Sequence, residues 1–465
     1  MKMNFLKRMA PCFSINEANI KILKEPNDFF QFIKSKSSSC TKRIVIASLY
    51  LGSGKKEKSL VDAIFNSINN NIKNKNFRVH LLFDATRGSR SVIDHEGNKS
   101  SSRLMCLPLL DNKQTLSRTK ISFFHTPNLR WWLYKVLPEK LNEVIGLQHM
   151  KIYLFDDCLV ISGANLSEDY FTNRQDRYFV FDNSPLLCDF YEELVDIVGS
   201  RSYSMTSMNS LESPKFGCDP LSGNFNEYVV EFRDAIESFI RCQIIKAQER
   251  ESTDSGELTR VYPLIQMGLF GIMQDQIVLK KLFEALSWEK DKQMSVALTS
   301  GYFNLDDDNE NLLFEIAKRN VSIEVLTAAP EANGFFKARG LMKYIPDVYT
   351  NILFDFQMRS LNLPIKTFEW RKKNWTFHAK GFWISKLISD YTQIYVTLIG
   401  STNYGYRSCF RDLESEILIE TQSEKLQKDL IDEKNRIYCN GLETQNQRVI
   451  PSWIPWVVPI VKYFF

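Results

Sequence analysis

Two of the five histidines stand in the same short motif, His-x-Lys, in separate halves of the sequence: His149 with Lys151, and His378 with Lys380. On an extended strand, residues i and i+2 point to the same face, so each motif places an imidazole beside an ammonium group. An imidazole can act as a nucleophile or carry a proton, and an ammonium group neutralises phosphate oxygens. The two motifs therefore predict a site that attacks and holds a phosphate group.

Further polar residues follow both motifs at matching positions. A glycine followed closely by an asparagine ends at Asn165 in the first half and at Asn403 in the second, and a carboxylate stands eleven residues after each asparagine, at Asp176 and Glu414. A lone histidine on an apolar strand is usually a core residue, and a lone carboxylate usually lies at the surface. Matched companions in both halves instead favour a repeated functional unit.

The two copies are not identical. Asp156 follows the first motif, whereas Ser385 stands at the corresponding position of the second, and the second copy has roughly eight extra residues before its glycine. These differences leave the support of the second motif open. The other histidines have no such companions, and we interpret them as structural: His80, His95 and His125.

The doubled pattern HxKxxxxD, with a glycine and an asparagine after it, resembles the phospholipase D superfamily. This resemblance implies an α/β fold of two pseudo-symmetric lobes, each a mixed sheet flanked by helices, with the active site between them. It implies that Asp176 and Glu414 each orient the histidine of their own copy and support its imidazolium form. It further implies catalytic roles for Asp156, Asn165 and Asn403.

The resemblance also implies transfer through a covalent phosphohistidine. His149 would attack the phosphorus, and His378 would act first as general acid and then as general base. Lys151, Lys380 and the two asparagines would stabilise charge on the phosphoryl oxygens. Because lysines would do this work, we expect neither a metal ion nor a cofactor.

The segments that position the motifs repeat in the same order in both halves, as strand, helix, strand and a strand that carries the histidine. The expected ranges are 43–51, 57–72, 77–83 and 146–155 in the first half, and 294–303, 309–319, 322–327 and 375–384 in the second. Strands that alternate with helices predict an α/β lobe that is used twice.

We expect five parts along the chain. Residues 1–16 are basic and apolar without an acidic residue, which is typical of a mitochondrial presequence, with an ordinary frayed terminus as the alternative. The others are a first phospholipase D-like lobe (17–199), a linker with a bridging helix (200–255), a second lobe (256–440) and an aromatic C-terminal tail (441–465).

Composition excludes several classes of protein. The chain is 44% hydrophobic and 25% charged, which is enough apolar material for a large core. The 59 basic and 55 acidic residues leave a net charge of +4, too small for a dedicated nucleic-acid binder, so we expect no nucleic-acid partner. Nine scattered cysteines without a CxxC pair indicate a reducing compartment and no zinc site. The sequence contains no long uncharged apolar run, so we expect no membrane-spanning helix.

Four stretches resemble the phosphatidylglycerophosphate synthase family in particular: 163–178, 263–268, 377–383 and 400–408. The resemblance covers about residues 40 to 440 and implies that CDP-diacylglycerol and glycerol 3-phosphate give phosphatidylglycerophosphate and CMP, a step of phosphatidylglycerol and cardiolipin synthesis. It implies a mitochondrial enzyme bound peripherally to the matrix side of the inner membrane. Phosphatidylserine synthases of bacterial type have similar motifs, so serine stays open as the acceptor.

Two substrates that carry phosphates need cations near the histidines, and the guanidinium fork suits phosphate oxygens. The candidates are Arg87, Arg174, Arg177, Arg407 and Arg411, of which we favour Arg174 and Arg407 because they follow the asparagines closely. The stretch 51–55 (Leu-Gly-Ser-Gly-Lys) lacks the spacing of a Walker loop, and we interpret it as a turn.

A lipid substrate needs an apolar approach, for which Trp131, Trp132 and the aromatic tail are candidates, with core packing as the alternative. Two other functions stay open at this point. One is a phosphodiesterase of the same superfamily, and the other is a non-enzymatic scaffold that binds anionic lipid.

Overall fold

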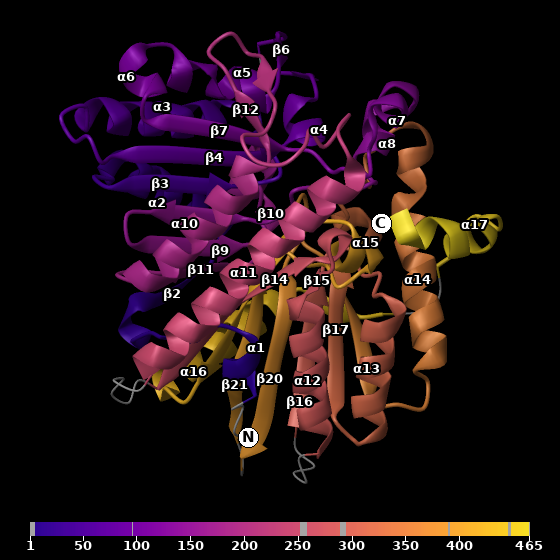
Figure 1. Cartoon of the computed structure of the whole chain (residues 1–465). Coiled ribbons are helices and arrows are strands. Elements are labelled where there is room, and N and C mark those ends of the chain that lie inside the picture. Colours follow the sequence, from indigo (N-terminus) through magenta and orange to yellow (C-terminus); the bar gives the residue numbers. More distant parts are fainter. Residues whose placement is uncertain are drawn as a thin grey trace.

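The computed structural model describes residues 5–94, 96–251, 258–288, 294–388, 391–444 and 448–464. It has two lobes, each built on one large mixed sheet, with the first lobe at the upper left of Figure 1 and the second below it. The long helix α11 (Phe225–Glu251) runs diagonally across the molecule, as predicted for a bridging helix. The predicted α/β fold of two lobes is confirmed.

The two sheets share one topology. In sheet order, the first consists of β13 (Leu211–Glu212), β12 (Tyr203–Met205), β7 (Thr119–Phe124), β4 (Arg78–Asp84), β3 (Arg43–Ala47), β8 (Ile152–Phe155), β9 (Cys158–Ser162), β11 (Tyr178–Phe181) and β2 (Ile20–Leu23). The second consists of β1 (Phe13–Ser14), β14 (Thr259–Met267), β22 (Glu414–Thr421), β21 (Tyr391–Gly400), β20 (Lys380–Ile388), β16 (Met294–Ser300), β17 (Ser322–Ala328), β18 (Ile365–Trp370) and β23 (Gly441–Glu443), with β15 (Ile272–Met273) beside β14.

Strand by strand, β7-β4-β3-β8-β9-β11-β2 corresponds to β18-β17-β16-β20-β21-β22-β14. In both series the first three strands are mutually parallel and each later pair is antiparallel. This agreement in direction and order is the structural form of the internal duplication read from the sequence.

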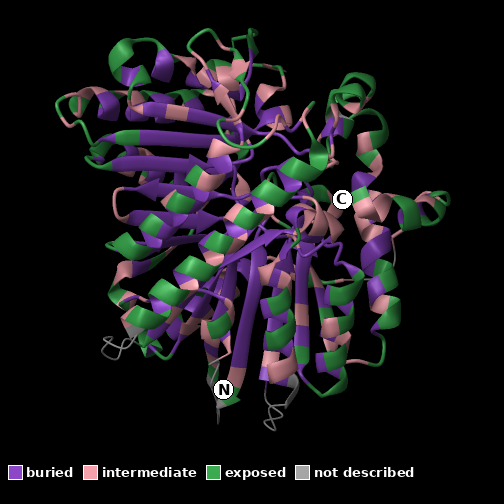
Figure 2. Ribbon diagram, viewed as in Figure 1, coloured by how far each residue is buried: buried purple, intermediate pink, exposed green. Residues whose placement is uncertain are grey.

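The strand β3 has no alternation of apolar and polar residues because both faces of its sheet are covered. Ile44 and Ile46 pack with the helices α2 (Pro26–Ser39) and α3 (Lys55–Asn70), whereas Val45 and Ala47 belong to a core that both lobes share. In Figure 2 the strands of both sheets are buried along most of their length, and the exposed residues lie mainly on the outer helices and loops.

Helices cover the sheets in equivalent ways. In the second lobe α12 (Gln274–Trp288), α13 (Asp307–Lys318) and α14 (Ile345–Arg359) pack on one face. The other helices are α1 (Leu6–Met9), α4 (Ala85–Ser89), α5 (Ser102–Cys106), α6 (Lys113–Leu116), α7 (Trp131–Val136), α8 (Glu139–Asn142), α9 (Glu168–Thr172), α10 (Pro185–Ser200), α15 (Tyr406–Phe410), α16 (Glu424–Tyr438) and α17 (Ile454–Val461).

The lobes are joined by one continuous apolar core. It contains Phe179 of the first sheet, Tyr228 of the bridging helix, and Ile265 and Trp383 of the second sheet. Between the sheets, the short strand β10 (Arg174–Gln175) of the first lobe pairs in parallel with β19 (Thr376–Phe377) of the second. The two lobes are therefore held in a fixed relation.

The segment 1–16 is integrated into the second lobe where it is described. Leu6 and Ala10 are fully buried in the core of that lobe, and β1 pairs with β14 at its edge. Cleavage after residue 16 would uncover this core and this strand edge. That the segment is a presequence stays a prediction.

Of the predicted domain limits, one falls outside the described residues, and another separates the tail from a lobe to which part of it belongs. The limit at 255/256 lies outside the described residues, as do positions 445–447 and 465 of the tail. The tail begins with β23, which belongs to the second sheet, and α17 then packs on α14 through Ile454 and Val458. The predicted tail is thus partly a component of the second lobe.

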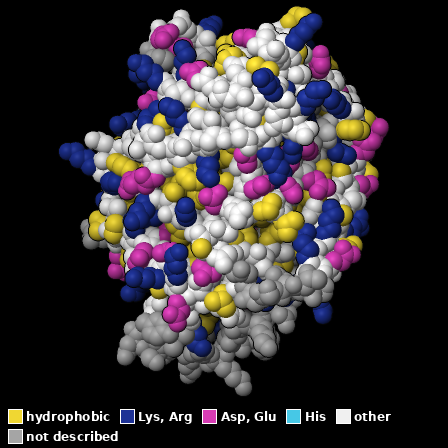
Figure 3. All heavy atoms as spheres, turned by 90° about the vertical axis from the view of Figure 1, so that its left-hand side faces the viewer, with side chains coloured by type: hydrophobic (Ala, Val, Ile, Leu, Met, Phe, Trp, Pro, Cys, Tyr) yellow, Lys and Arg dark blue, Asp and Glu magenta, His cyan; other side chains and the backbone are white. Residues whose placement is uncertain are grey.

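The surface carries mixed charge on the face seen in Figure 3, where basic and acidic side chains lie among one another over the first lobe. All nine cysteines lie among the described residues and are free thiols. In the part of the chain that the structure describes, no helix combines the length and apolar character that crossing a bilayer requires.

Candidate active site

Both histidines lie just before a strand, where the two lobes meet. His149 precedes β8 and His378 precedes β20. Each is bonded to the backbone of the other lobe: the His149 amide donates to the carbonyl of Leu413 at 2.9 Å, and the His378 amide donates to that of Gln175 at 2.8 Å. The backbone therefore fixes the two motifs relative to each other.

A cavity of about 360 Å³ lies between the lobes, and both histidines line it. Its polar wall includes Tyr50, Arg87, Arg90, Asn165, Tyr170, Arg174, Tyr302, Asn403, Arg407 and Asp412. Its apolar wall includes Phe335, Met342, Ile345 and Phe464. A molecule with a phosphate and an apolar portion would find complementary groups at the two walls.

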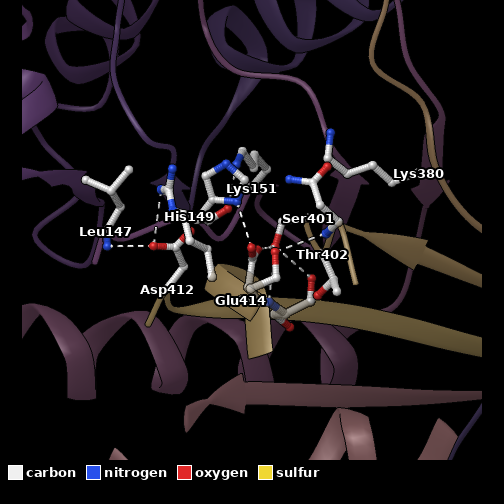
Figure 4. Close-up of polar contacts among 12 residues, drawn as sticks. Leu147, His149, Lys151, Lys380, Ser401, Thr402, Asp412 and Glu414 are labelled. Carbon is white, nitrogen blue, oxygen red and sulfur yellow. Dashed lines mark hydrogen bonds and ion pairs between the residues drawn. The ribbon is translucent and has the colours of Figure 1, made fainter. Parts of the chain in front are cut away.

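The carboxylates contact the histidines across the lobes, not within them. Glu414 of the second lobe accepts a hydrogen bond from Nδ1 of His149, with 2.8 Å between the atoms, as Figure 4 shows. Asp176 of the first lobe lies 2.7 Å from Nδ1 of His378. The prediction that each carboxylate orients the histidine of its own copy was wrong, because Asp176, which lies between β10 and β11, and Glu414, the first residue of β22, each face the histidine of the other lobe. Both carboxylates still fix a histidine tautomer with Nε2 toward the cavity.

Burial sets the protonation of this centre. The pKa of each histidine lies well below the ordinary value of 6.5, because burial disfavours the imidazolium and the lysine of the same motif repels it. Both imidazoles are therefore neutral at physiological pH, which a nucleophile requires. Burial raises the pKa of Asp176 to about 6 and also raises that of Glu414, and nearby lysines oppose both shifts.

The two lysines are held by their own motifs. The Nζ of Lys151 donates to the carbonyl of His149 at 2.7 Å, and the Nζ of Lys380 donates to the carbonyl of His378 at 2.8 Å. Burial lowers the pKa of both lysines, to about 8 for Lys380, although the carboxylates oppose this shift. A phosphate group in the cavity would restore their preference for the charged form.

The surroundings of the two imidazoles differ at Nε2. The hydroxyl of Tyr170 and the Nζ of Lys380 each lie 3.1 Å from Nε2 of His378, and both donate to it because Nδ1 of that ring holds the proton directed at Asp176. Among the described residues, Nε2 of His149 has no hydrogen-bond partner. Ser408 stands in the second copy where Tyr170 stands in the first, five residues after the asparagine. This difference makes the two histidines chemically distinct.

Both asparagines line the cavity, and the Oδ1 atom of each has no hydrogen-bond partner among the described residues. The Nδ2 of Asn165 donates to the Tyr170 hydroxyl at 3.3 Å, while its Oδ1 is buried without a partner among the described residues. The Oδ1 of Asn403 is likewise buried without one. Amide oxygen and nitrogen positions are assigned from the network, so either end can meet a ligand after a flip.

Three of the five predicted arginines line the cavity. Arg87 stacks on Tyr50, Arg174 pairs with Asp169 at 3.2 Å, and Arg407 pairs with Asp412 at 3.1 Å.

The other two predicted arginines do not line the cavity. Arg177 is fully buried against Glu433, with 2.8 Å between Nε and Oε1, and it donates to backbone carbonyls of the second sheet, so it joins the lobes and its prediction as a substrate ligand was wrong. Arg411 donates to the carbonyl of Val144 at 3.1 Å.

The predicted catalytic role of Asp156 was also wrong. This residue lies in the turn after β8, at the opposite end of the strand from His149, and its carboxylate accepts hydrogen bonds from the amides of Thr41, Lys42 and Arg43. In the second copy Ser385 bonds to Ser295 on the neighbouring strand at 2.6 Å, at the equivalent distant end. The replacement of aspartate by serine therefore leaves the histidine site untouched.

We expect Asp156→Ala to reduce stability and to spare catalysis. Three backbone amides would lose their acceptor, a loss of about 1–3 kcal/mol in the free energy of unfolding. The site lies on the order of 20 Å away along the strand, so turnover per folded molecule should stay near that of wild type. Chemical unfolding and active-site titration measure both quantities. Asp156→Asn is the matched control, because asparagine keeps an acceptor and tolerates the positive φ of 54°. A loss of turnover without a loss of stability would contradict this account.

Two functional positions were missed from the sequence. Tyr170 lies within a stretch that was used for the family resemblance, but nothing in its spacing pointed to His378. Asp412 accepts a hydrogen bond from the amide of Leu147 at 2.9 Å and lies beside His149 in Figure 4. It stands two residues before Glu414, and the i, i+2 rule that was applied to the motifs would have placed it on the same face.

One group among the described residues has the convergence of metal ligands: His149, Asp412 and Glu414. Asp412 is already paired with Arg407, and Glu414 accepts hydrogen bonds from His149 and Ser401. A cation would compete with these partners. The expectation of a metal-independent site stays a prediction.

The pKa shifts predict a bell-shaped dependence of kcat/KM on pH. As pH falls through about 6, Asp176 becomes protonated and can no longer accept the proton of His378. As pH rises through about 8, Lys380 loses its charge. Lys380→Arg should remove the alkaline limb, because a guanidinium stays charged. Initial rates across this range at constant ionic strength check the profile, and an unchanged alkaline limb in Lys380→Arg would exclude Lys380 as its source.

No family model matches the sequence. Proteins named CDP-diacylglycerol–glycerol-3-phosphate 3-phosphatidyltransferase, mitochondrial, are 35% identical to it in Gallus gallus and in Homo sapiens, and both alignments cover all of this chain and 86% of the relative. The crystal structure of phosphatidylserine synthase from Haemophilus influenzae Rd KW20 matches with a TM-score of 0.71 at 18% identity, over 99% of this chain and 100% of that one. This structural likeness concerns the fold.

Proposed function

The chain belongs to the family of CDP-diacylglycerol–glycerol-3-phosphate 3-phosphatidyltransferases, and we propose that its cavity transfers the phosphatidyl group through a covalent bond to His149. The enzyme is a phosphatidyltransferase of phospholipid synthesis, with CDP-diacylglycerol as donor and glycerol 3-phosphate as acceptor. The covalent route, the residues and the release of CMP are the proposal.

The observation that carries the proposal is the difference between the two Nε2 atoms. Nε2 of His149 faces the cavity without a partner among the described residues, whereas Nε2 of His378 accepts a hydrogen bond from Tyr170. A nucleophile needs an open lone pair, and a group that exchanges protons with a hydroxyl benefits from a hydroxyl already in place. This supports His149 as nucleophile and His378 as the base of the second step.

In the first step, Nε2 of His149 forms a bond to the phosphorus of the phosphatidyl group. The bond from that phosphorus to the bridging oxygen of the diphosphate breaks, and CMP leaves with the electron pair. Lys151, Lys380 and the two asparagines are placed to stabilise the phosphoryl oxygens, and Glu414 supports the positive charge on His149.

In the second step, a hydroxyl oxygen of glycerol 3-phosphate attacks the phosphorus from the side that CMP has left. His378 takes the hydroxyl proton at Nε2, where Tyr170 donates in the free enzyme, and Asp176 supports the imidazolium that forms. The bond between phosphorus and Nε2 breaks, which returns His149 to its neutral state. Phosphatidylglycerophosphate is released, and His378 returns to its neutral form by passing the proton to solvent.

The direct test uses purified protein with labelled CDP-diacylglycerol in excess EDTA. We expect transfer to glycerol 3-phosphate, with one CMP released for each product. Serine and water are the competing acceptors. Comparable transfer to serine, or equally fast hydrolysis without an acceptor, would contradict the assignment. Loss of turnover under chelation that Mg²⁺ restores would contradict the metal-independent mechanism.

We further propose that the enzyme binds the membrane peripherally through an apolar rim around the cavity. The rim consists of residues 335–342, which contribute to the cavity wall, of α17, which precedes the lining residue Phe464, and of α7, which lies on the same side of the molecule in Figure 1. Its exposed apolar side chains are Trp131, Trp132, Phe336, Leu341, Trp456 and Ile460. Exposed basic residues stand among them, including Lys337, Arg339 and Lys343, which suits an anionic bilayer.

The vertebrate relatives are named mitochondrial, which supports a mitochondrial location for this chain. We further propose the matrix side of the inner membrane, which the family resemblance implies. Peripheral attachment agrees with the absence of a spanning helix from the described residues.

Trp456→Ser should weaken binding to anionic vesicles several-fold without lowering the melting temperature, because this side chain is 84% exposed. Ile454→Ala is the matched control on the same helix. Ile454 is fully buried against α14, so its truncation should lower the melting temperature while the exposed rim keeps its composition. Vesicle sedimentation and thermal unfolding measure the two effects. Unchanged vesicle binding of Trp456→Ser would remove α17 from the membrane surface.

A further inference from the structure

A second cavity, of about 440 Å³, adjoins the active site. The two cavities share Tyr50, Arg87 and Arg90 in their walls, so these side chains form the boundary between them. The second cavity is enclosed by the loop 51–54 before α3, by the strand β5 (Val92–Ile93) and by the start of α9. The stretch 51–55, interpreted from the sequence as a turn, thus lies beside the catalytic centre.

The boundary is cationic. The guanidinium of Arg87 stacks on the ring of Tyr50 at 4.1 Å, and no carboxylate among the described residues pairs with it. Arg90 pairs with Glu143. An unpaired guanidinium held by stacking is a ready ligand for phosphate oxygens.

Beyond the arginines, the second cavity is rich in hydrogen-bond acceptors. Its wall contains the carboxylates of Glu57, Asp94, Glu168 and Asp169 and the hydroxyls of Ser53 and Ser167. Acceptors of this kind repel a second phosphate but suit sugar hydroxyls and the amino group of a base. Met342 and Phe464, which form the apolar end of the active-site cavity, do not line the second cavity.

Glu57 provides a buried acceptor in this wall. The residue is 1% exposed, and its Oε1 accepts a hydrogen bond from the amide of Glu168 at 2.6 Å. Its Oε2 is buried without a partner among the described residues. A buried carboxylate oxygen without a donor is costly, so a ligand donor at this point would be strongly favoured.

The loop is shaped around this carboxylate. A Cβ atom added at Gly52 would lie 2.4 Å from Oε1 of Glu57, and one added at Gly54 would lie 2.6 Å from its Oε2. A larger residue at either position would push this carboxylate from its place. The two glycines therefore keep an acidic group at the floor of the cavity.

We propose that the second cavity is the nucleoside subsite and receives the cytidine of CDP-diacylglycerol, with the diphosphate at Arg87 and Glu57 as acceptor for a sugar hydroxyl or the base amino group. This inference rests on the proposed function. It orients the donor: the lipid extends past the histidines toward Met342 and Phe464, and CMP departs toward α3. The acceptor glycerol 3-phosphate then approaches from elsewhere in the active-site cavity.

Two variants test the subsite, with CMP as the probe. Ser53→Trp fills the cavity without touching the histidines, and Glu57→Gln keeps the shape and the bond to Glu168 while replacing the free acceptor. For each we expect the inhibition constant of CMP and the KM for CDP-diacylglycerol to rise about tenfold or more, as the loss of one buried hydrogen bond predicts. The KM for glycerol 3-phosphate and inhibition by inorganic phosphate should not change.

Lys58→Trp is the matched control, because Lys58 is exposed on the same helix and does not line the cavity. It should behave as wild type, and thermal unfolding of all three variants separates a binding defect from a folding defect. A rise in the KM for glycerol 3-phosphate instead would assign the cavity to the acceptor and overturn the proposal, as would unchanged constants in well-folded variants. If wild type transfers nothing from CDP-diacylglycerol, the proposed function fails, whatever CMP binding shows.

Discussion

We expect His378→Ala to release one CMP per active site and then to stall, whereas His149→Ala should release none. The departing CMP carries a phosphate with a second pKa near about 6, so it needs little protonation to leave. The glycerol hydroxyl is a far weaker acid, and its attack depends on a base. Without His378 the enzyme should therefore stop as a phosphatidyl-histidine, and without His149 the nucleophile itself is gone.

Rapid-quench assays with CDP-diacylglycerol labelled in the phosphatidyl group measure this difference. The label should stay on the His378→Ala protein, be acid-labile and alkali-stable, and map to His149. A label that maps to His378 in the His149→Ala protein would reverse the roles. If neither variant retains label while wild type turns over, the covalent route loses its support. Asp156→Asn, which lies far from the site, is the control for handling losses.

The second large effect is a crossed pair of carboxylate phenotypes. Glu414→Gln should slow CMP release, as damage to His149 does, although Glu414 belongs to the second copy. Asp176→Asn should permit the burst and slow the second step, as damage to His378 does. The side-chain amide of each variant would hold the histidine in the wrong tautomer or fail to support its imidazolium form. The equivalent substitution in a triad enzyme lowers kcat about 10⁴-fold. We expect the rate of the affected step to fall about 10²–10⁴-fold.

Burst amplitude and the rate of the second step separate the two variants in one experiment. If Asp176→Asn instead abolished the burst, each carboxylate would serve its own copy and the pairing across the lobes would be wrong. Double variants give a further check: Glu414→Gln should add little to His149→Ala, because residues that act as one unit are not additive. Glu414→Gln combined with His378→Ala should lose the burst.

The fold was predictable because the two copies carry the same order of strand and helix patterns and the same motif. Apolar runs such as 43–47 read as buried strands, and His149 and His378 were found from residue type and spacing alone. Spacing along a chain gives the face of a strand on which a residue lies. It does not give the end of the sheet at which the residue lies, so spacing could not correct the role that the family resemblance implied for Asp156, which lies at the far end of the strand from His149.

Pairing across the lobes could not be derived from either copy. Asp176 and Glu414 stand at the same distance from their asparagines, so the sequence alone offers two equal assignments. Only the docking of the lobes decides between them. Arg177 shows the same limit, because an arginine next to a catalytic carboxylate looks like a phosphate ligand until Glu433, far along the chain, is found beside it. The second cavity could not be predicted either, because three segments that are separate in the sequence come together to form its wall.

The pairing of β1 with β14 has a consequence for how the chain assembles. Phe13 lies opposite Val261, so β1 must wait for the whole first lobe and the bridging helix to be made before it finds its partner. Until then the edge of the second sheet stays open, and such an edge invites pairing with other chains. Contacts between such distant positions also slow folding. Chaperone occupancy during synthesis or import would be expected to concentrate on this interval, and the fold would be complete only once β1 has paired with β14.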